Sequence, residues 1–254
     1  MAVRDVFETA VVILADRVGE IGDSDCEELG DGWLVQPVNA ITSFAYVVVG
    51  LGVLGDGFRR HRATVDTWVF AVLMAAVGLG SVAFHGPQPG GARVMHDLPI
   101  LLVVLYIVAR DIELLRSHPS RWALFVPAAV VATGVTLISV DVGTALTGIG
   151  VIAVAGLEAV IYRRRLRGPD DRRRRRSALV VISVAAIAGA TWLLGRTDSP
   201  ACDPDGVFQF HGLWHVLSAA VFGLWWWIAS VPATGHDDDA PADLSSSVPS
   251  TPPT

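Results

Sequence analysis

The chain has 254 residues, 52% of them hydrophobic, and a mean hydropathy of +0.51. Its apolar residues are gathered in blocks close to the ~20 residues that a helix needs to cross a bilayer, which argues against an ordinary soluble domain. The formal net charge of −6 excludes little, because the charges are segregated along the chain. All 19 basic residues are arginine, which together with abundant Ala, Val and Gly is typical of a GC-rich bacterial genome.

Residues 1–37 precede the first long apolar block and are predicted to form an extracytoplasmic N-terminal segment. Charged residues close to the N-terminus leave only a short apolar stretch around Val11–Ala15, so no cleavable signal peptide is expected. At the other end, residues 231–254 are rich in Asp, Pro and Ser and contain almost nothing to bury. They are predicted to be a disordered cytoplasmic tail.

Seven apolar blocks within residues 38–230 predict an all-α membrane protein, a bundle of seven transmembrane helices. The third block is short and is expected to continue past Arg110, whose side chain can reach the interface. Glu158 and Trp225–Trp227 fall near the ends of their blocks and are expected to be interfacial. A tight turn near Asp141–Gly143 separates the fourth block from the fifth. The predicted spans are Val38–Leu54, Trp68–His85, Asp97–Ala109, Trp122–Val140, Gly143–Tyr162, Ala178–Gly195 and Phe210–Ile228.

The placement of arginine predicts the orientation of the bundle. Fifteen of the 19 arginines fall in the first, third and fifth loops, and only four fall on the other side. The odd loops are therefore predicted to be cytoplasmic, with the N-terminus outside and the C-terminus inside. The fifth loop carries nine arginines between Arg163 and Arg176. Such a cluster can grip nucleic acid, but between two apolar spans we interpret it as an anchor facing anionic lipid heads, and no nucleic-acid partner is predicted.

The two cysteines, Cys26 and Cys202, lie in short polar segments on the side that is predicted to be outside the cell. Disulfides persist in that compartment, so a bond between the two is favoured, with two free thiols as the alternative. The bond would tie the N-terminal segment over the mouth of the bundle, next to the start of the seventh helix.

Four of the seven histidines gather at the predicted outer face, whereas His61, His118 and His236 fall on the cytoplasmic side as solvated surface residues. Histidine at membrane depth is costly and is therefore usually paired or functional. Among them, His211 and His215 are one turn apart on one helical face, where both imidazoles can reach one ion. The four histidines at the outer face are His85, His96, His211 and His215.

Two further polar residues accompany these histidines. Ser81 precedes His85 by four residues, and Asp97 stands at the head of the third span. Three histidines and a water form the ligand set of catalytic zinc, and a nearby carboxylate and hydroxyl can orient that water. A lone histidine pair is a weak signal, because it can equally form hydrogen bonds or ligate haem, and Ser81 alone would be an ordinary packing residue. The arrival of a third histidine and Asp97 at the same depth favours the metal site.

Three segments of the sequence resemble motifs of the alkaline ceramidases and their bacterial relatives. Gly78–His85 is similar to their G-x-G-S-x-x-F-H segment, and Phe210–His215 is similar to their seventh-helix H-x-W-H-like element. Cys26–Glu28 followed by Gln36–Asn39 resembles their C-E…E-P-x-N entry into the first helix. These enzymes belong to the CREST superfamily of seven-helix membrane metal hydrolases, which also includes the adiponectin and progestin receptors.

The resemblance implies a fold of seven helices and a zinc ion held by His85, His211 and His215. It also implies that Ser81 and an acidic residue on the third helix assist the water at the metal. The implied reaction is cleavage of an amide in a lipid, which releases a fatty acid from the sphingoid base when the substrate is ceramide. The family's cysteines correspond to the two cysteines of this chain, which supports the disulfide.

The sequence departs from the family pattern at the acidic residue. With Leu98–Pro99 as the anchor, the family's catalytic Asp falls on His96, and Asp97 stands one place later. One extra residue in the Gly90–Gly91 loop would restore Asp97 to this role. Asp97 is preferred as the acid–base residue because histidine cannot supply the same constant negative charge, and His96 is kept as the alternative to Asp97.

A calcium cluster of the family's N-terminal segment is only partly retained. Asp25 and Glu27 are candidate calcium ligands, but Gln36 stands where a glutamate is expected and Leu29 where a polar ligand would help. Calcium as a cofactor is therefore doubtful, whereas zinc is predicted.

The sequence thus predicts a zinc-dependent hydrolase of an N-acyl lipid, embedded in a bacterial cell membrane with its active site towards the extracytoplasmic face. Lipid substrates would enter from the membrane, and the metal would activate water for attack on the amide. The alternative is a seven-helix lipid or ligand receptor with a structural zinc. Electron transfer by a bis-histidine haem fits poorly with a third histidine and Asp97.

Overall fold

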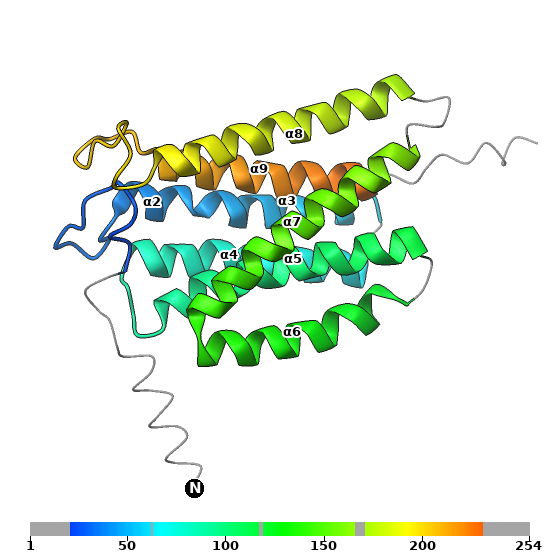
Figure 1. Cartoon of the computed structure of the whole chain (residues 1–254), viewed down its shortest axis with the longest axis horizontal. Coiled ribbons are helices and arrows are strands. Elements are labelled where there is room, and N and C mark those ends of the chain that lie inside the picture. The colour runs from blue at the N-terminus through cyan, green and yellow to red at the C-terminus, as the bar shows by residue number, and fades with distance from the viewer. Residues whose placement is uncertain (1–20, 62, 117–118, 166–170, 231–254) are drawn as a thin grey trace, which may run out of the picture.

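A computed structural model describes residues 21–61, 63–116, 119–165 and 171–230, which are helical throughout apart from their connections and one isolated bridge (Figure 1). The predictions for the N-terminal 20 residues, His118, His236 and the tail from residue 231 lie outside these ranges. The helices are α2 (Pro37–Thr42), α3 (Phe44–Arg59), α4 (Val65–His85), α5 (Ala92–Arg116), α6 (Arg121–Ile138), α7 (Val140–Arg165), α8 (Asp171–Leu194) and α9 (Phe210–Ser230).

The predicted spans coincide largely with helices, except that the first covers α2 and part of α3, which are separated at Ser43, and two further boundaries were wrong. The third span begins at Ala92, so His96 and Asp97 lie in its second turn and not at its head. The turn between α6 and α7 lies at Ser139, before the predicted Asp141–Gly143. Ser139 is extended, and its hydroxyl accepts a hydrogen bond from the backbone N–H of Val142 at 3.4 Å. It therefore acts as a helix N-cap, a local signal that the predicted turn near Asp141–Gly143 overlooked.

Five helical segments in the described part of the chain are long and apolar enough to cross a membrane. The remaining long helices are α5, which carries charges such as Asp97 and Arg110, and α9, which carries two histidines and several tryptophans. The outward faces of the apolar helices expose large side chains, for example Ile138 at 81% and Ile152 at 75%. Exposed apolar surface on this scale belongs in contact with lipid, so the chain is an integral membrane protein. The count of seven spans and their orientation stay predictions.

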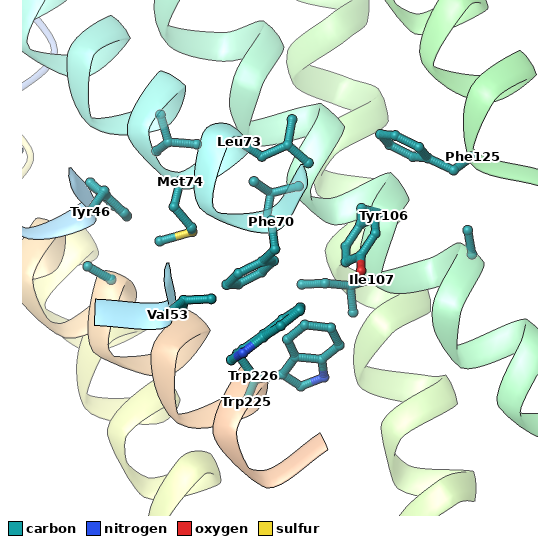
Figure 2. Close-up of a cluster of buried hydrophobic side chains, with 14 residues drawn as sticks. Tyr46, Val53, Phe70, Leu73, Met74, Tyr106, Ile107, Phe125, Trp225 and Trp226 are labelled. Atoms are coloured by element: carbon teal, nitrogen blue, oxygen red, sulfur yellow. The ribbon is translucent and has the colours of Figure 1, made fainter. Parts of the chain in front are cut away.

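An aromatic cluster lies among α4, α5 and α9 (Figure 2). Phe70 of α4 stacks on Trp226 of α9 with 4.7 Å between ring centroids, and Trp225 packs against the same ring. The indole N–H of Trp225 donates to Glu158 of α7. Trp225 and Trp226 are buried, so the prediction that they are interfacial was wrong. The burial of these two indoles depends on contacts with α4 and α7, which the sequence around them does not reveal. Trp227, in contrast, is 39% exposed.

The connections sort to the two ends of the bundle (Figure 1). The C-terminal ends of α3, α5 and α7 and the starts of α4, α6 and α8 lie at one end. The segment 21–36 and the connections 86–91 and 195–209 lie at the opposite end. The candidate residues of the site belong to this second end.

Candidate metal centre

Three histidines meet at the end of the bundle that carries the segment 21–36. His85 is the last residue of α4, and His211 and His215 lie in the first two turns of α9. One ring nitrogen of each lies within 4.8 Å of the others, and the ring centroids are 4.7–5.1 Å apart. All three side chains are buried. The predicted H-x-x-x-H pair therefore converges with a third histidine, in a set that can hold a metal ion.

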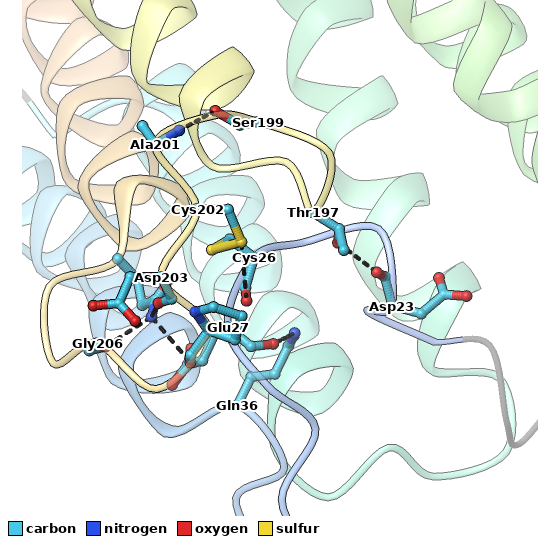
Figure 3. The surroundings of a disulfide bond; sticks show 12 residues. Asp23, Cys26, Glu27, Gln36, Thr197, Ser199, Ala201, Cys202, Asp203 and Gly206 are labelled. Atoms are coloured by element: carbon cyan, nitrogen blue, oxygen red, sulfur yellow. Dashed lines mark hydrogen bonds between the residues drawn. A yellow bond between two sulfur atoms is a disulfide. The ribbon is translucent and has the colours of Figure 1, made fainter.

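Gln36 fixes the ring of His85. Its amide nitrogen donates to the carbonyl oxygens of Gly22 at 3.0 Å and Glu27 at 2.7 Å, so its oxygen must face the ring (Figure 3). That oxygen lies 2.7 Å from Nδ1 of His85 and can only accept, which places the ring hydrogen on Nδ1. Nε2 of His85 is then a buried lone pair without a hydrogen-bond partner, as a metal ligand requires. In the sequence, Gln36 was interpreted only as a residue that replaces an expected calcium-binding glutamate. Its role as the hydrogen-bond partner of His85 was not predicted.

The two histidines of α9 have similar partners. Nδ1 of His215 lies 3.1 Å from the carbonyl oxygen of Asn39, which can only accept. Nδ1 of His211 lies 3.2 Å from a carboxylate oxygen of Asp25, an ion-pair distance without hydrogen-bond alignment. Carbonyl or carboxylate groups behind each imidazole are the usual outer partners of metal-binding histidines, because they fix the tautomer and the ring orientation. The donor set therefore fits a divalent metal.

Ser81 lies beside the cluster because glycines let α4 approach its neighbours. Its hydroxyl is buried, 2.8 Å from the hydroxyl of Ser43 and 3.4 Å from Nε2 of His215. A Cβ atom on Gly80 would lie 1.8 Å from the backbone oxygen of Met95, so only glycine allows α4 and α5 to touch here. The G-x-G-S pattern thus brings the serine and the start of α5 to the histidines.

His96 and Asp97 lie on α5 next to the cluster but differ in what they face. The ring of His96 is 5.9 Å from that of His85 and packs on Phe84 at 4.6 Å. Asp97 accepts from Nδ1 of His96 at 2.6 Å and from the hydroxyl of Thr144 on α7 at 2.6 Å. The acid–base role of Asp97 stays a prediction. Thr144 carries no local signal that could have identified it, because it lies 47 residues further along the chain.

The two candidate calcium ligands bind other protein groups. Asp25 accepts from Arg196 at 3.1 Å, and its burial raises the pKa of the carboxyl to about 6 against the opposing effect of that guanidinium. The carboxylate of Glu27 accepts from the backbone N–H groups of Val38 at 2.7 Å and Asn39 at 2.8 Å. Burial raises the pKa of Glu27, and these two hydrogen bonds oppose the shift. Glu27 therefore caps the start of α2, and a calcium site is not part of our proposal.

The predicted disulfide is confirmed. Cys26 and Cys202 are bonded, with their Cα atoms 5.4 Å apart (Figure 3). The backbone N–H of Cys26 donates to the carbonyl of Gly195 at 2.8 Å, so the segment 21–36 is also tied to the end of α8. The bond therefore joins the segment that carries Gln36 to the connection that leads into α9.

Replacement of Cys202 by serine is expected to destabilise the protein by about 2–4 kcal/mol, because the bond closes a loop of 176 residues. The measurement is the thermal midpoint in detergent, with wild-type protein treated with a reductant as the matched comparison. Non-reduced digests of the wild type should contain the two linked peptides. Alkylation of both thiols in the untreated wild type would refute the bond.

The fold and the site together define an integral membrane protein whose three buried histidines can hold a metal ion. The family model described as Ceramidase matches residues 34–245, most of the chain. The chain therefore belongs to the ceramidase family, as its motifs predicted, and this membership implies a hydrolase that acts on amide bonds of lipids. No curated protein gives a significant match to the chain.

Proposed function

We propose that the chain is a zinc-dependent hydrolase that cleaves the amide bond of an N-acyl lipid such as ceramide. The observation that carries the proposal is the set of three buried histidine nitrogens within 4.8 Å of one another, in a member of the ceramidase family. Imidazole nitrogens suit zinc, and three protein ligands are typical of catalytic sites that keep one position open. His85, His211 and His215 would hold the ion.

The chain's own groups supply the rest of the chemistry. When bound, a Lewis-acidic zinc ion polarises the scissile carbonyl and makes water a stronger nucleophile. The hydroxyl of Ser81 would donate to the oxygen that becomes negative as the carbonyl is attacked. Because Ser81 and the three histidines are buried, this interaction acts in a low dielectric and is stronger than in water. A proton must also be moved, and His96 and Asp97 lie beside the cluster for this step.

Apolar residues beside the site support access from the membrane. Leu79 and Met95 flank the glycine contact of α4 and α5 and are 55% and 46% exposed. At the same end, Trp33 and Phe208 are exposed in the connections, where amphipathic or aromatic side chains favour the membrane interface. We infer that acyl chains approach laterally from the leaflet on this side, with the amide at the depth of the histidines.

The test is turnover of purified protein with a panel of long-chain N-acyl amides and matched esters, scored by release of fatty acid. The expected result is release from at least one amide, a fall to background after treatment with a chelator, and recovery on addition of zinc. Release that survives complete removal of the metal would overturn metal dependence. Full zinc content without release from any lipid would favour the receptor alternative.

A further inference from the structure

Resting on this proposed function, we infer that His96 is the proton-transferring catalytic residue and that Asp97 and Thr144 position it. Three contacts in series support the assignment. Thr144 donates to one oxygen of Asp97 at 2.6 Å, and the other oxygen lies 2.6 Å from Nδ1 of His96. The ring of His96 then meets the ring of His85 edge-on, with 5.9 Å between centroids. The chain of contacts runs from α7 through α5 to the histidine cluster.

Both carboxylate oxygens of Asp97 are engaged in this arrangement. A carboxylate held between a hydroxyl donor and an imidazole is suited to orienting the imidazole, since it fixes the ring hydrogen on Nδ1 and leaves Nε2 to exchange a proton. With one hydrogen bond on each oxygen, the carboxylate resembles the orienting acid of a pair in which the imidazole transfers the proton. The geometry therefore assigns the direct role to the histidine that the sequence analysis had kept as the alternative.

His96 is also distinct from the candidate ligands. The three ligand nitrogens lie within 4.8 Å of one another, and among the described residues that set does not include His96. Its side chain is 19% exposed, whereas that of His85 is fully buried. His96 thus lies at the rim of the cluster, where water and a lipid amide would arrive. Its packing on Phe84 with an interplanar angle of 32° holds the ring in place.

The proton balance of the step is simple. Water adds to the amide carbonyl, a C–O bond forms, and the proton that the water loses passes to Nε2 of His96. The imidazolium is stabilised by the carboxylate of Asp97 through the shared hydrogen bond. The same proton passes to the amine nitrogen as the C–N bond breaks. The products are a fatty acid and a free amine, and His96 returns to its neutral form.

The test compares variants by kcat, KM and zinc content of the metal-loaded protein. His96→Ala and Asp97→Asn should each lower kcat by about 10²–10⁴-fold, with KM and zinc content little changed. The double variant should lose no more than the worse single variant, because the two residues act as a unit. Added imidazole should restore part of the turnover of His96→Ala and none of that of Asp97→Asn. His96→Gln serves as a second variant if the alanine variant folds poorly.

Thr144→Val should lower kcat, and Thr144→Ser, which keeps the hydroxyl, should restore it. Two matched controls should leave turnover unchanged. His61→Asn replaces an exposed histidine at φ 52°, a conformation that asparagine tolerates. Asp141→Asn replaces an exposed carboxylate that pairs with Arg93 near the same end of the bundle.

A readout that does not depend on turnover is the Nδ1 proton of His96 in histidine-labelled protein. A strongly downfield resonance should be present in the wild type, absent in Asp97→Asn and retained in Asp141→Asn. Near wild-type kcat in His96→Ala together with loss in Asp97→Asn would overturn the inference in favour of direct action by Asp97. Loss of zinc from His96→Ala would also overturn it and would make His96 a ligand. Failure of the proposed function is distinguishable, because the wild type itself would then release no fatty acid.

Discussion

The His211→Ala/His215→Ala double variant is expected to lose its bound metal and all turnover. The two imidazoles lie one turn apart on α9, and together with His85 they provide the three converging ring nitrogens. A single remaining imidazole cannot retain zinc at micromolar concentrations, because zinc affinity depends on several ligands acting together. Elemental analysis should find about one zinc per wild-type chain and less than about a tenth of that in the variant.

The matched control for this prediction is His61→Asn, which removes an exposed histidine at the opposite end of the bundle and should keep the full zinc content. Far-ultraviolet circular dichroism should show that the double variant retains its helices, because the two side chains contribute a small part of the buried surface. Full zinc in a folded double variant would place the metal elsewhere and would remove the basis of the proposed function.

Gly80→Ala is expected to destabilise the protein by about 3 kcal/mol or more, the upper range for overpacking of a well-packed interior. The new Cβ would lie 1.8 Å from the backbone oxygen of Met95, and a backbone atom cannot move away without separating α4 from α5. Turnover should fall with stability, because the same contact sets the distance between Ser81 and the start of α5. The measurement is the thermal midpoint in detergent, together with fatty-acid release.

Gly148→Ala is the control for the same chemical change. Gly148 is exposed on α7, and a Cβ there would meet nothing within 4 Å. Alanine is a better helix former than glycine by about 1 kcal/mol, so this variant should be neutral or slightly stabilised. Equal midpoints for the two alanine variants would show that α4 and α5 do not touch as described.

Much of this protein could be predicted from its sequence, because a membrane helix is recognisable from its own apolar residues. A long apolar block must be helical to satisfy its backbone in lipid, so all seven predicted spans coincide largely with helices of the structure. His211 and His215 could likewise be assigned to one face from their spacing alone. His85 and Ser81 were candidates from their positions, and the family motifs gave them roles, but their meeting with α9 depends on distant contacts that no local pattern encodes.

The directions of individual side chains could not be predicted. Asp97 and His96 are neighbours in sequence, and a choice between them needs the position of Thr144, which belongs to another helix. Gln36 appeared to be a substitution that weakens a calcium site, whereas its amide in fact joins the segment 21–36 to His85. Burial of Trp226 depends on the ring of Phe70, more than 150 positions away in the chain, and no periodicity within α9 reports it.

The disulfide has a consequence for the orientation of the candidate metal ligands. Gln36 and Asp25 lie directly behind the rings of His85 and His211, and the bond at Cys26 fastens the segment that carries them. The disulfide therefore holds in place the groups that orient two of the three imidazoles, and reduction of the cysteines is expected to loosen the orientation of these rings.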